Sequence, residues 1–145
     1  MRNEYIYQVP FDELKAAVEL DFPGFGIAED KNIRFFNYHT PNITSGRKQV
    51  TIRFAKPTEN KLIRLPTAQT LPWLETSPEN PYAGPQIGEI YIPRIAVATV
   101  RDFPAAWAKL DLYPTKKAML EDIGNTYHHV LQPDDVLSMY WIDPC

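Results

Sequence analysis

Proline constrains the fold of this chain more than any other feature of its sequence. The chain has 145 residues and 14 prolines, and five of the prolines fall between Pro66 and Pro85. A proline has no backbone N–H and fixes φ, so it interrupts both helices and strand ladders. We therefore expect short helices and strands, and a long, semi-rigid loop over residues 66–86 that carries Trp73 and Tyr82.

Three segments have the signals of helices. Phe11–Leu20 follows a proline, has acidic residues in its first turn and repeats apolar residues at helical spacing. A second helix is expected from Pro104 to Leu110, because proline is favoured in a first turn. A third is expected over Thr115–Ile123, with Thr115 as its N-cap and Gly124 as its stop.

Alternation of apolar and polar residues predicts the strands, and it is clearest over Arg47–Phe54. Further strands are expected at Asn32–Asn37, Lys61–Leu65, Ile87–Ile92, Arg94–Arg101 and Val136–Ile142. This order of helices and strands predicts one α+β domain over residues 1–145, built on a mixed sheet or small barrel. Residues 1–32 would be a helical N-terminal extension, and residues 66–86 a proline-rich loop insertion.

Charge and cysteine content exclude several classes of protein. The net charge is -3, which is unlike a strongly basic nucleic-acid binder. The single cysteine, Cys145, allows neither an internal disulfide nor a cysteine-based zinc site. The three histidines form no metal motif, so we expect no metal and no cofactor. The N-terminal residues have no apolar signal core, and no apolar run is long enough to cross a membrane, so a cytoplasmic protein without membrane contact is expected.

The segment with the most chemical information is Ser45–Arg53. Residues two apart on a strand share a face, so Thr51 and Arg53 should lie together, opposite Val50 and Ile52. Lys48 would fall on the apolar side of a regular strand, but Gly46 permits a turn or bulge that swings it towards Thr51. A lysine with a lowered pKa can then take the proton of a threonine hydroxyl and make it a nucleophile. The same pattern is also that of an edge strand with a solvated polar face.

The sequence of this segment, SGRKQVTIR, closely resembles the first-strand signature of ASCH-domain proteins in the PUA-like superfamily. It is most similar to the small bacterial N4-acetylcytidine amidohydrolases. A weaker similarity extends over residues 33–143, and the N-terminal helix and the proline-rich segment are departures from the family. The resemblance implies an α+β fold, a PUA-like mixed β-barrel with flanking helices. It also implies an amidohydrolase that removes an acyl group from the N4 amine of a modified cytosine nucleoside.

The resemblance also implies a role for each residue of the motif. Lys48 would activate the nucleophile, Thr51 would attack the acyl carbonyl, and Arg53 would orient the substrate or stabilise charge. The family uses a further glutamate near the end of the helix that follows the third strand, and Asp111 lies closest to that position. Two other carboxylates remain alternatives for this third role: Glu121 and Glu89.

ASCH proteins also include RNA-binding and ribonuclease-like members, in which the motif lysine lies in a basic cleft. The partner is therefore expected to be a modified nucleoside or single-stranded RNA, and an RNA-binding module or ribonuclease is the alternative function. The net negative charge favours the small nucleoside, because binding to a polymer draws heavily on phosphate contacts. The basic residues that could line the cleft are Arg47, Lys48, Arg53, Lys56, Lys61 and Arg64.

Aromatic and hydroxyl side chains could hold a base within this cleft by stacking or hydrogen bonding. The candidates are Trp73, Tyr82, Tyr38 and Ser138. Ser138 should share a face with Val136 and Tyr140 on the closing strand. Trp107 lies within a predicted helix, and we interpret it as a core residue.

Overall fold

The computed structural model describes residues 4–8, 10–55, 62–66 and 69–145. Within these ranges the strands form two four-stranded sheets and one two-stranded pair. The first sheet has the order β1-β8-β9-β4 and is antiparallel throughout. Its strands are β1 (Glu4–Tyr7), β4 (Val50–Phe54), β8 (Ile95–Thr99) and β9 (Val136–Trp141).

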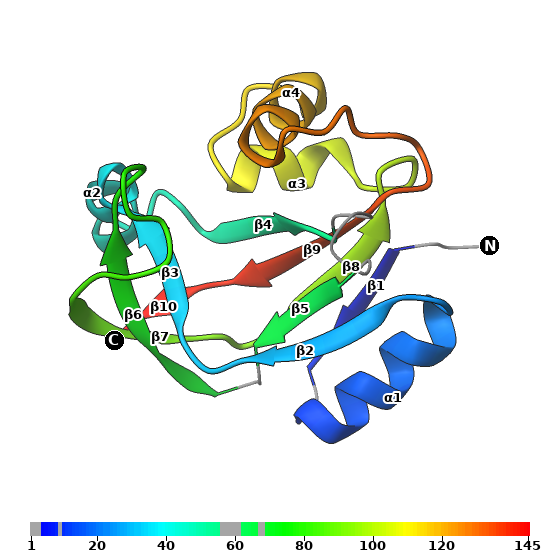
Figure 1. Cartoon of the computed structure of the whole chain (residues 1–145), viewed down its shortest axis with the longest axis horizontal. Coiled ribbons are helices and arrows are strands. Elements are labelled where there is room, and N and C mark those ends of the chain that lie inside the picture. The colour runs from blue at the N-terminus through cyan, green and yellow to red at the C-terminus, as the bar shows by residue number, and fades with distance from the viewer. Residues whose placement is uncertain (1–3, 9, 56–61, 67–68) are drawn as a thin grey trace.

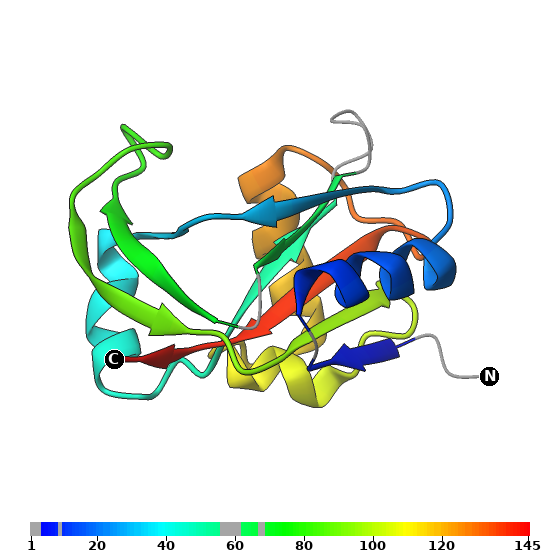
Figure 2. The ribbon, with the colours of Figure 1, turned by 90° about the horizontal axis from the view of Figure 1, so that it is seen from below.

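The second sheet has the order β10-β7-β6-β3, in which β3 runs parallel to β6 and the other neighbours are antiparallel. Its strands are β3 (Ile33–Phe36), β6 (Thr70–Thr76), β7 (Gln86–Tyr91) and β10 (Asp143–Pro144). The parallel pair joins β2 (Gly26–Asp30) to β5 (Leu62–Pro66). Figures 1 and 2 show these strands curling around a common interior as an open barrel.

Helices flank the barrel on different sides. In Figure 1, α3 and α4 lie together over one face of the first sheet, and α1 lies on the opposite side of the molecule. Thr115 caps α4 as expected, because its hydroxyl accepts a hydrogen bond from the amide of Ala118 at 3.0 Å. The helical segments are α1 (Phe11–Asp21), the 3₁₀ turn η1 (Asn37–His39), α2 (Thr40–Thr44), α3 (Ala105–Leu110) and α4 (Lys116–Tyr127).

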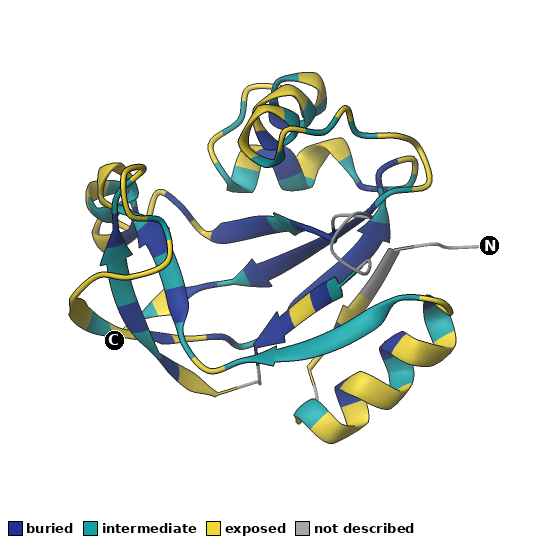
Figure 3. Cartoon of the chain, in the orientation of Figure 1, coloured by how far each residue is buried: buried dark blue, intermediate teal, exposed yellow. Residues whose placement is uncertain are grey.

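The two faces of the first sheet bury different sets of residues. The face with Val50, Ile52 and Phe54 packs on α3 and α4, where it meets Met119 and Ile123. The opposite face points into the barrel and joins a larger apolar cluster. That cluster includes Leu14, Phe35, Ile63, Trp73, Ile90, Ile95, Val97 and Tyr140. Figure 3 shows this burial along the strands, while the outer sides of the helices are exposed.

The prediction of a loop over residues 66–86 is wrong for the first half of that segment, because β6 occupies Thr70–Thr76. Pro72 lies within this strand, opposite Glu89 of β7. The pairing of β6 with β3 begins only at Trp73, so Pro72 lies where one side of the strand is unpaired, and its missing N–H costs no ladder bond. The loop itself is confined to residues 77–85.

The N-terminal segment and the end of α4 also differ from expectation. Residues 1–32 are not a purely helical extension, since β1 pairs with β8 and β2 pairs with β5. Gly124 does not end α4, which continues to Tyr127 and ends at His128 with a φ of 55°. Instead, a Cβ at Gly124 would lie 2.7 Å from the carbonyl oxygen of His129, so glycine is needed for the close return of the chain.

The structure bears on membrane-spanning helices and on metal sites only for the described part of the chain. No helix there combines the length and the apolar character that crossing a membrane requires. The same residues contain no group of three or more histidine, cysteine, aspartate or glutamate side chains placed to hold a metal ion. Lys56 and Lys61, which the sequence suggested for a basic cleft, lie outside the described residues.

Candidate functional site

The residues of the sequence motif lie where the free edges of the two sheets face each other. β4 is an edge strand of the first sheet and β3 is an edge strand of the second. Arg53 of β4 bridges the two edges, because its Nη2 donates a hydrogen bond to the carbonyl oxygen of Arg34 on β3 at 2.9 Å. On β4, Thr51 and Arg53 lie opposite Tyr140 and Ser138, on the face that points into the barrel.

Lys48 reaches this region because the strand does not extend back to it. Gly46 has a φ of 79°, and β4 begins only at Val50. The amide of Lys48 donates to the carbonyl oxygen of Asn42 at 2.9 Å, and the amide of Gln49 donates to that of Leu110 at 3.1 Å. The chain before β4 is thereby held between α2 and α3, and the alternation of the strand does not apply to Lys48.

The Lys48 ammonium group is buried against a carboxylate. It donates a hydrogen bond to Asp111 Oδ1, and the side chains of Lys48 and Asp111 are only 5% and 6% exposed. Asp111 ends α3 as its C-cap residue, where the backbone amide of Ile52 also favours its charged form. A carboxylate therefore lies in direct contact with Lys48, as the sequence suggested for Asp111.

The alternative carboxylates lie elsewhere. Besides Asp111, the acidic group whose charge acts on Lys48 is Asp122 of α4. Glu89 is exposed on β7. Glu121 is exposed on α4, where it lines a separate groove of about 840 Å³ with Leu120 and Val130.

Burial moves both members of the Lys48–Asp111 pair towards their neutral forms. It lowers the pKa of Lys48, an effect that Asp111 opposes and that the nearby charge of Arg53 reinforces. It raises the pKa of Asp111, although Lys48, Arg53 and the Ile52 amide favour the charged carboxylate. The two pKa values approach each other, so moving the proton between these groups costs less than it would in water.

Phe35 brings the lysine and the Thr51–Arg53 pair together. Its ring centroid lies 5.8 Å from Lys48 Nζ and 5.3 Å from Arg53 Cζ. The Thr51 hydroxyl accepts a hydrogen bond from Arg53 Nε at 3.1 Å, and Thr51 is 4% exposed. We call the five residues Phe35, Lys48, Thr51, Arg53 and Asp111 the Lys48 site. A cation, a hydroxyl and a carboxylate are thus buried around Phe35 and Arg53, where charge interactions are stronger than in water.

Sequence reasoning missed a histidine next to this site. His39 of η1 has its pKa lowered to about 4, first by burial and then by the charges of Lys48 and Arg53, so its imidazole is neutral at neutral pH. The ring of Tyr38 lies 4.4 Å from that of His39, and the pKa of Tyr38 is raised first by burial and then by the charge of Asp122. No motif marks His39 or Asp122, because their proximity arises only when η1 and α4 approach each other.

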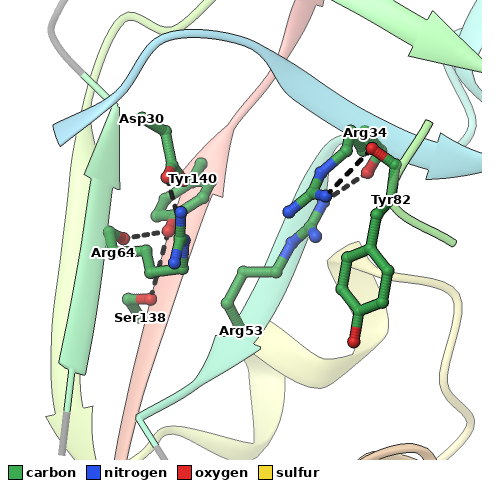
Figure 4. Close-up of polar contacts among 7 residues, drawn as sticks. All are labelled: Asp30, Arg34, Arg53, Arg64, Tyr82, Ser138 and Tyr140. Atoms are coloured by element: carbon green, nitrogen blue, oxygen red, sulfur yellow. Dashed lines mark hydrogen bonds and ion pairs between the residues drawn. The ribbon is translucent and has the colours of Figure 1, made fainter. Parts of the chain in front are cut away.

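The binding residues expected from the sequence divide into three groups. Tyr82 and Tyr38 are exposed, at 79% and 60%, and Tyr82 lies under the guanidinium of Arg34 with 5.5 Å between Cζ and the ring centroid (Figure 4). Ser138 is buried, and its hydroxyl donates to that of Tyr140 at 3.4 Å. Arg47 is exposed and donates a hydrogen bond within its own turn, to Ser45 Oγ at 3.3 Å.

The expectation of an exposed stacking surface at Trp73 is wrong. Trp73 is 4% exposed within β6 and belongs to the interior apolar cluster. A Cβ at Gly88 of β7 would lie 3.3 Å from its indole ring, so the ring packs closely on that strand. Its Nε1 has no hydrogen-bond partner among the described residues. Trp107, interpreted as a core residue, is only partly buried; it packs against the apolar cluster under α3 and α4, edge-on to Phe103 and Trp141.

Comparisons with known proteins give one informative likeness. No family model matches the sequence, and no curated protein matches it. A crystal structure of an ASCH domain from Lactobacillus crispatus superposes with a TM-score of 0.54 and 13% sequence identity. The match covers 92% of this chain and 89% of that one. At this identity the likeness concerns the fold alone, and it confirms the expected architecture: the chain has the α+β, PUA-like fold of an ASCH domain, a mixed β-barrel with flanking helices.

Proposed function

We propose that this protein is a hydrolase that removes an acyl group from the N4 amine of a modified cytosine nucleoside resembling N4-acetylcytidine. The observation that supports this proposal most directly is the buried Lys48–Asp111 pair, with its lowered lysine pKa, beside the Thr51–Arg53 hydrogen bond. A titratable group that is desolvated and has a specific charged partner is a candidate for a functional site, and Lys48 has both features. The sequence resemblance adds the substrate class.

In the proposed reaction, the neutral amine of Lys48 takes the proton of the Thr51 hydroxyl, and Thr51 Oγ1 attacks the acyl carbon. The bond between that carbon and N4 breaks, and the leaving amine takes the proton from Lys48. Water then attacks the acyl-threonine ester with Lys48 again as the base, which releases the acid and restores Thr51. The Arg53 Nε–H group points at Thr51 Oγ1 and would stabilise negative charge on it.

Asp111 holds Lys48 in position in this scheme and makes its protonated form less costly when the proton arrives. The family resemblance has a glutamate in this role, which is one methylene longer. The aspartate reaches the lysine because Lys48 leaves the strand before β4 and because Asp111 lies at the end of α3.

The burial of Lys48 also bears on the alternative function, an RNA-binding module or ribonuclease. A lysine that is 5% exposed and paired with a carboxylate is poorly placed to contact a phosphate. The observation that favours RNA is a different one, the exposed Tyr82 ring beside Arg34, because aromatic and guanidinium groups stack on unpaired bases.

The test is to incubate the protein with N4-acetylcytidine and with single-stranded RNA, and to follow cytidine release and chain cleavage by chromatography. Thr51→Val keeps the β-branched shape and should lower cytidine release by orders of magnitude, while the loss of the acceptor for Arg53 Nε should lower the free energy of unfolding by about 1–3 kcal/mol. The matched control is Thr126→Val, since the Thr126 hydroxyl on α4 donates only to a backbone carbonyl. Near wild-type turnover in Thr51→Val would exclude the nucleophile role, and RNA cleavage without cytidine release would favour the alternative.

A further inference from the structure

Two arginines, Arg53 of the Lys48 site and Arg34 next to it, have no direct acidic partner in the described part of the chain. Among the described residues, Arg34 and Arg53 form no ion pair with an aspartate or glutamate, whereas Arg64 pairs with Asp30 and Arg101 pairs with Asp134, each at 3.0 Å. The partners of Arg34 and Arg53 are instead a hydroxyl group, carbonyl oxygens and aromatic rings.

Neutral acceptors hold both guanidinium groups in place. Arg53 donates to the Thr51 hydroxyl and to the carbonyl oxygen of Arg34. Arg34 Nη1 donates to the carbonyl oxygen of Tyr82 at 3.4 Å, and its guanidinium lies over the Tyr82 ring. Figure 4 shows the two arginine side chains directed towards each other beside Tyr82. A guanidinium has five N–H donors, so each group keeps donors for a further acceptor.

The loop that carries Tyr82 is itself fixed to the second sheet. The amide of Glu75 on β6 donates to the carbonyl oxygen of Pro85 at 3.0 Å. A Cβ at Gly84 would lie 1.9 Å from the carbonyl oxygen of Glu75, so only glycine allows this approach. The arginine–tyrosine contact is therefore built on an anchored turn, and little ordering is needed when a ligand binds.

Two like charges held close together, neither in a direct ion pair with a carboxylate among the described residues, favour an anion that both can contact. Arginine matches phosphate because its planar fork makes two parallel hydrogen bonds to the oxygens. We propose that Arg34 and Arg53, with Tyr82, bind the phosphate group of a nucleotide. The preferred substrate would then carry a phosphate, as a nucleoside monophosphate or as a nucleotide unit of RNA, and a free nucleoside would bind more weakly. This inference rests on the proposed function, because it names the substrate class of the same site.

The experiment measures binding by titration calorimetry, with compounds that cannot be deacylated. The probes are cytidine, cytidine 5′-monophosphate, inorganic phosphate and a short single-stranded oligocytidine, tested on the whole protein at low and high salt. We expect the monophosphate to bind about tenfold or more tightly than cytidine at low salt, and this advantage to shrink as salt rises.

The diagnostic variant is Arg34→Gln, since Arg34 is not part of the Lys48 site. It should weaken monophosphate binding about tenfold and cytidine binding much less, because cytidine lacks the phosphate that Arg34 is proposed to bind. Arg94→Gln is the matched control, because Arg94 also lies over an aromatic ring, that of Trp141, with 4.1 Å between Cζ and the centroid. Equal affinities for cytidine and its monophosphate, or equal effects of the two variants, would overturn the proposal.

The remaining measurements distinguish a nucleoside monophosphate from an RNA chain as the source of the phosphate. They also test the phosphate site separately from the proposed hydrolase. An oligocytidine that binds more tightly than the monophosphate identifies an RNA chain, and one that binds no more tightly identifies the monophosphate. Suppose that Arg34→Gln weakens the binding of inorganic phosphate, and that cytidine 5′-monophosphate binds no more tightly than inorganic phosphate. The phosphate site then stands, and the proposed cytosine hydrolase fails.

Discussion

Two ion pairs in this molecule have similar partners but opposite surroundings. Arg64 of β5 and Asp30 of β2 link the parallel pair, with side chains 50% and 18% exposed. Lys48 and Asp111 are 5% and 6% exposed. An exposed pair contributes about 0–1 kcal/mol to stability, whereas a buried pair loses so much hydration that apolar residues of similar size are often more stabilising. The burial of Lys48 and Asp111 is therefore better explained by a chemical role than by a contribution to stability.

The largest expected effect comes from breaking the buried pair on one side. Asp111→Leu leaves the Lys48 ammonium buried without its partner, which should lower the free energy of unfolding by about 3–5 kcal/mol at neutral pH in urea denaturation. Burial lowers the pKa of Lys48 in the folded state, so the unfolded chain binds more protons below the usual lysine pKa. Stability therefore rises with pH, and the deficit of Asp111→Leu should shrink in alkaline buffer as Lys48 loses its proton.

The control removes both charges. Lys48→Met combined with Asp111→Leu should return the free energy of unfolding to within about 1 kcal/mol of the wild type, since no buried charge remains. The same double variant should show no deacylation. A double variant as unstable as Asp111→Leu alone would mean that the pair is structural, and the contrast between the two ion pairs would then lose its functional meaning.

A smaller change in the free energy of unfolding is expected at acidic pH. It tests whether the charges of the Lys48 site act on neighbouring buried groups as described. The pKa of His39 is about 4 in the folded protein, below its ordinary value of 6.5, because of burial and the charges of Lys48 and Arg53, with Asp122 acting in the opposite direction. The unfolded chain therefore binds more protons between these pH values, and stability falls as pH decreases from 6.5 to about 4. His39→Gln should flatten this part of the profile.

The acid effect can be checked on the histidine itself. Titration of the His39 imidazole by NMR should give a low pKa, and Arg53→Met should raise it, because one of the two cationic neighbours is removed. A His39 that titrates near 6.5 in the wild type would contradict the electrostatic description of the site.

The smallest effect is expected at the exposed pair. Arg64→Met and Asp30→Asn should each change the free energy of unfolding by less than about 1 kcal/mol, and high salt should remove most of the difference. The backbone carbonyl of Arg64, which accepts a hydrogen bond from the Tyr140 hydroxyl, is unaffected by these changes. A coupling energy above about 2 kcal/mol between Arg64 and Asp30 in a double-mutant cycle would contradict this expectation. It would show that the exposed pair interacts as strongly as a buried one.

The sequence predicted the parts of the site that depend on local pattern. The alternation along β4 predicts that Thr51 and Arg53 share a face opposite Val50 and Ile52, and in the structure both lie on the barrel side of the sheet, opposite Tyr140 and Ser138. Gly46 permits the turn that frees Lys48 from that alternation. The catalytic and binding roles of these residues remain predictions.

The sequence could not predict the contacts that depend on pairing between distant strands and helices. Arg34, Phe35 and His39 reach the site because β3 joins β6 in parallel, and no local pattern gives that pairing. The proline-rich segment was misassigned for a related reason. The number of prolines predicts a loop, but Pro72 is tolerated because of the side of β6 on which it lies, and that depends on its neighbours.

The position of β4 at the edge of its sheet has a consequence for the order in which the site can form during synthesis. Within the described residues, β4 pairs with β9 alone, and β9 comes more than eighty positions after the start of β4 in the chain. A nascent chain that already contains Lys48, Thr51, Arg53 and Asp111 still has no strand on which β4 can pair until Val136–Trp141 leaves the ribosome. The acid–base groups would therefore assemble in one of the last folding steps, and a shortened translation product would carry the complete motif without a strand to organise it.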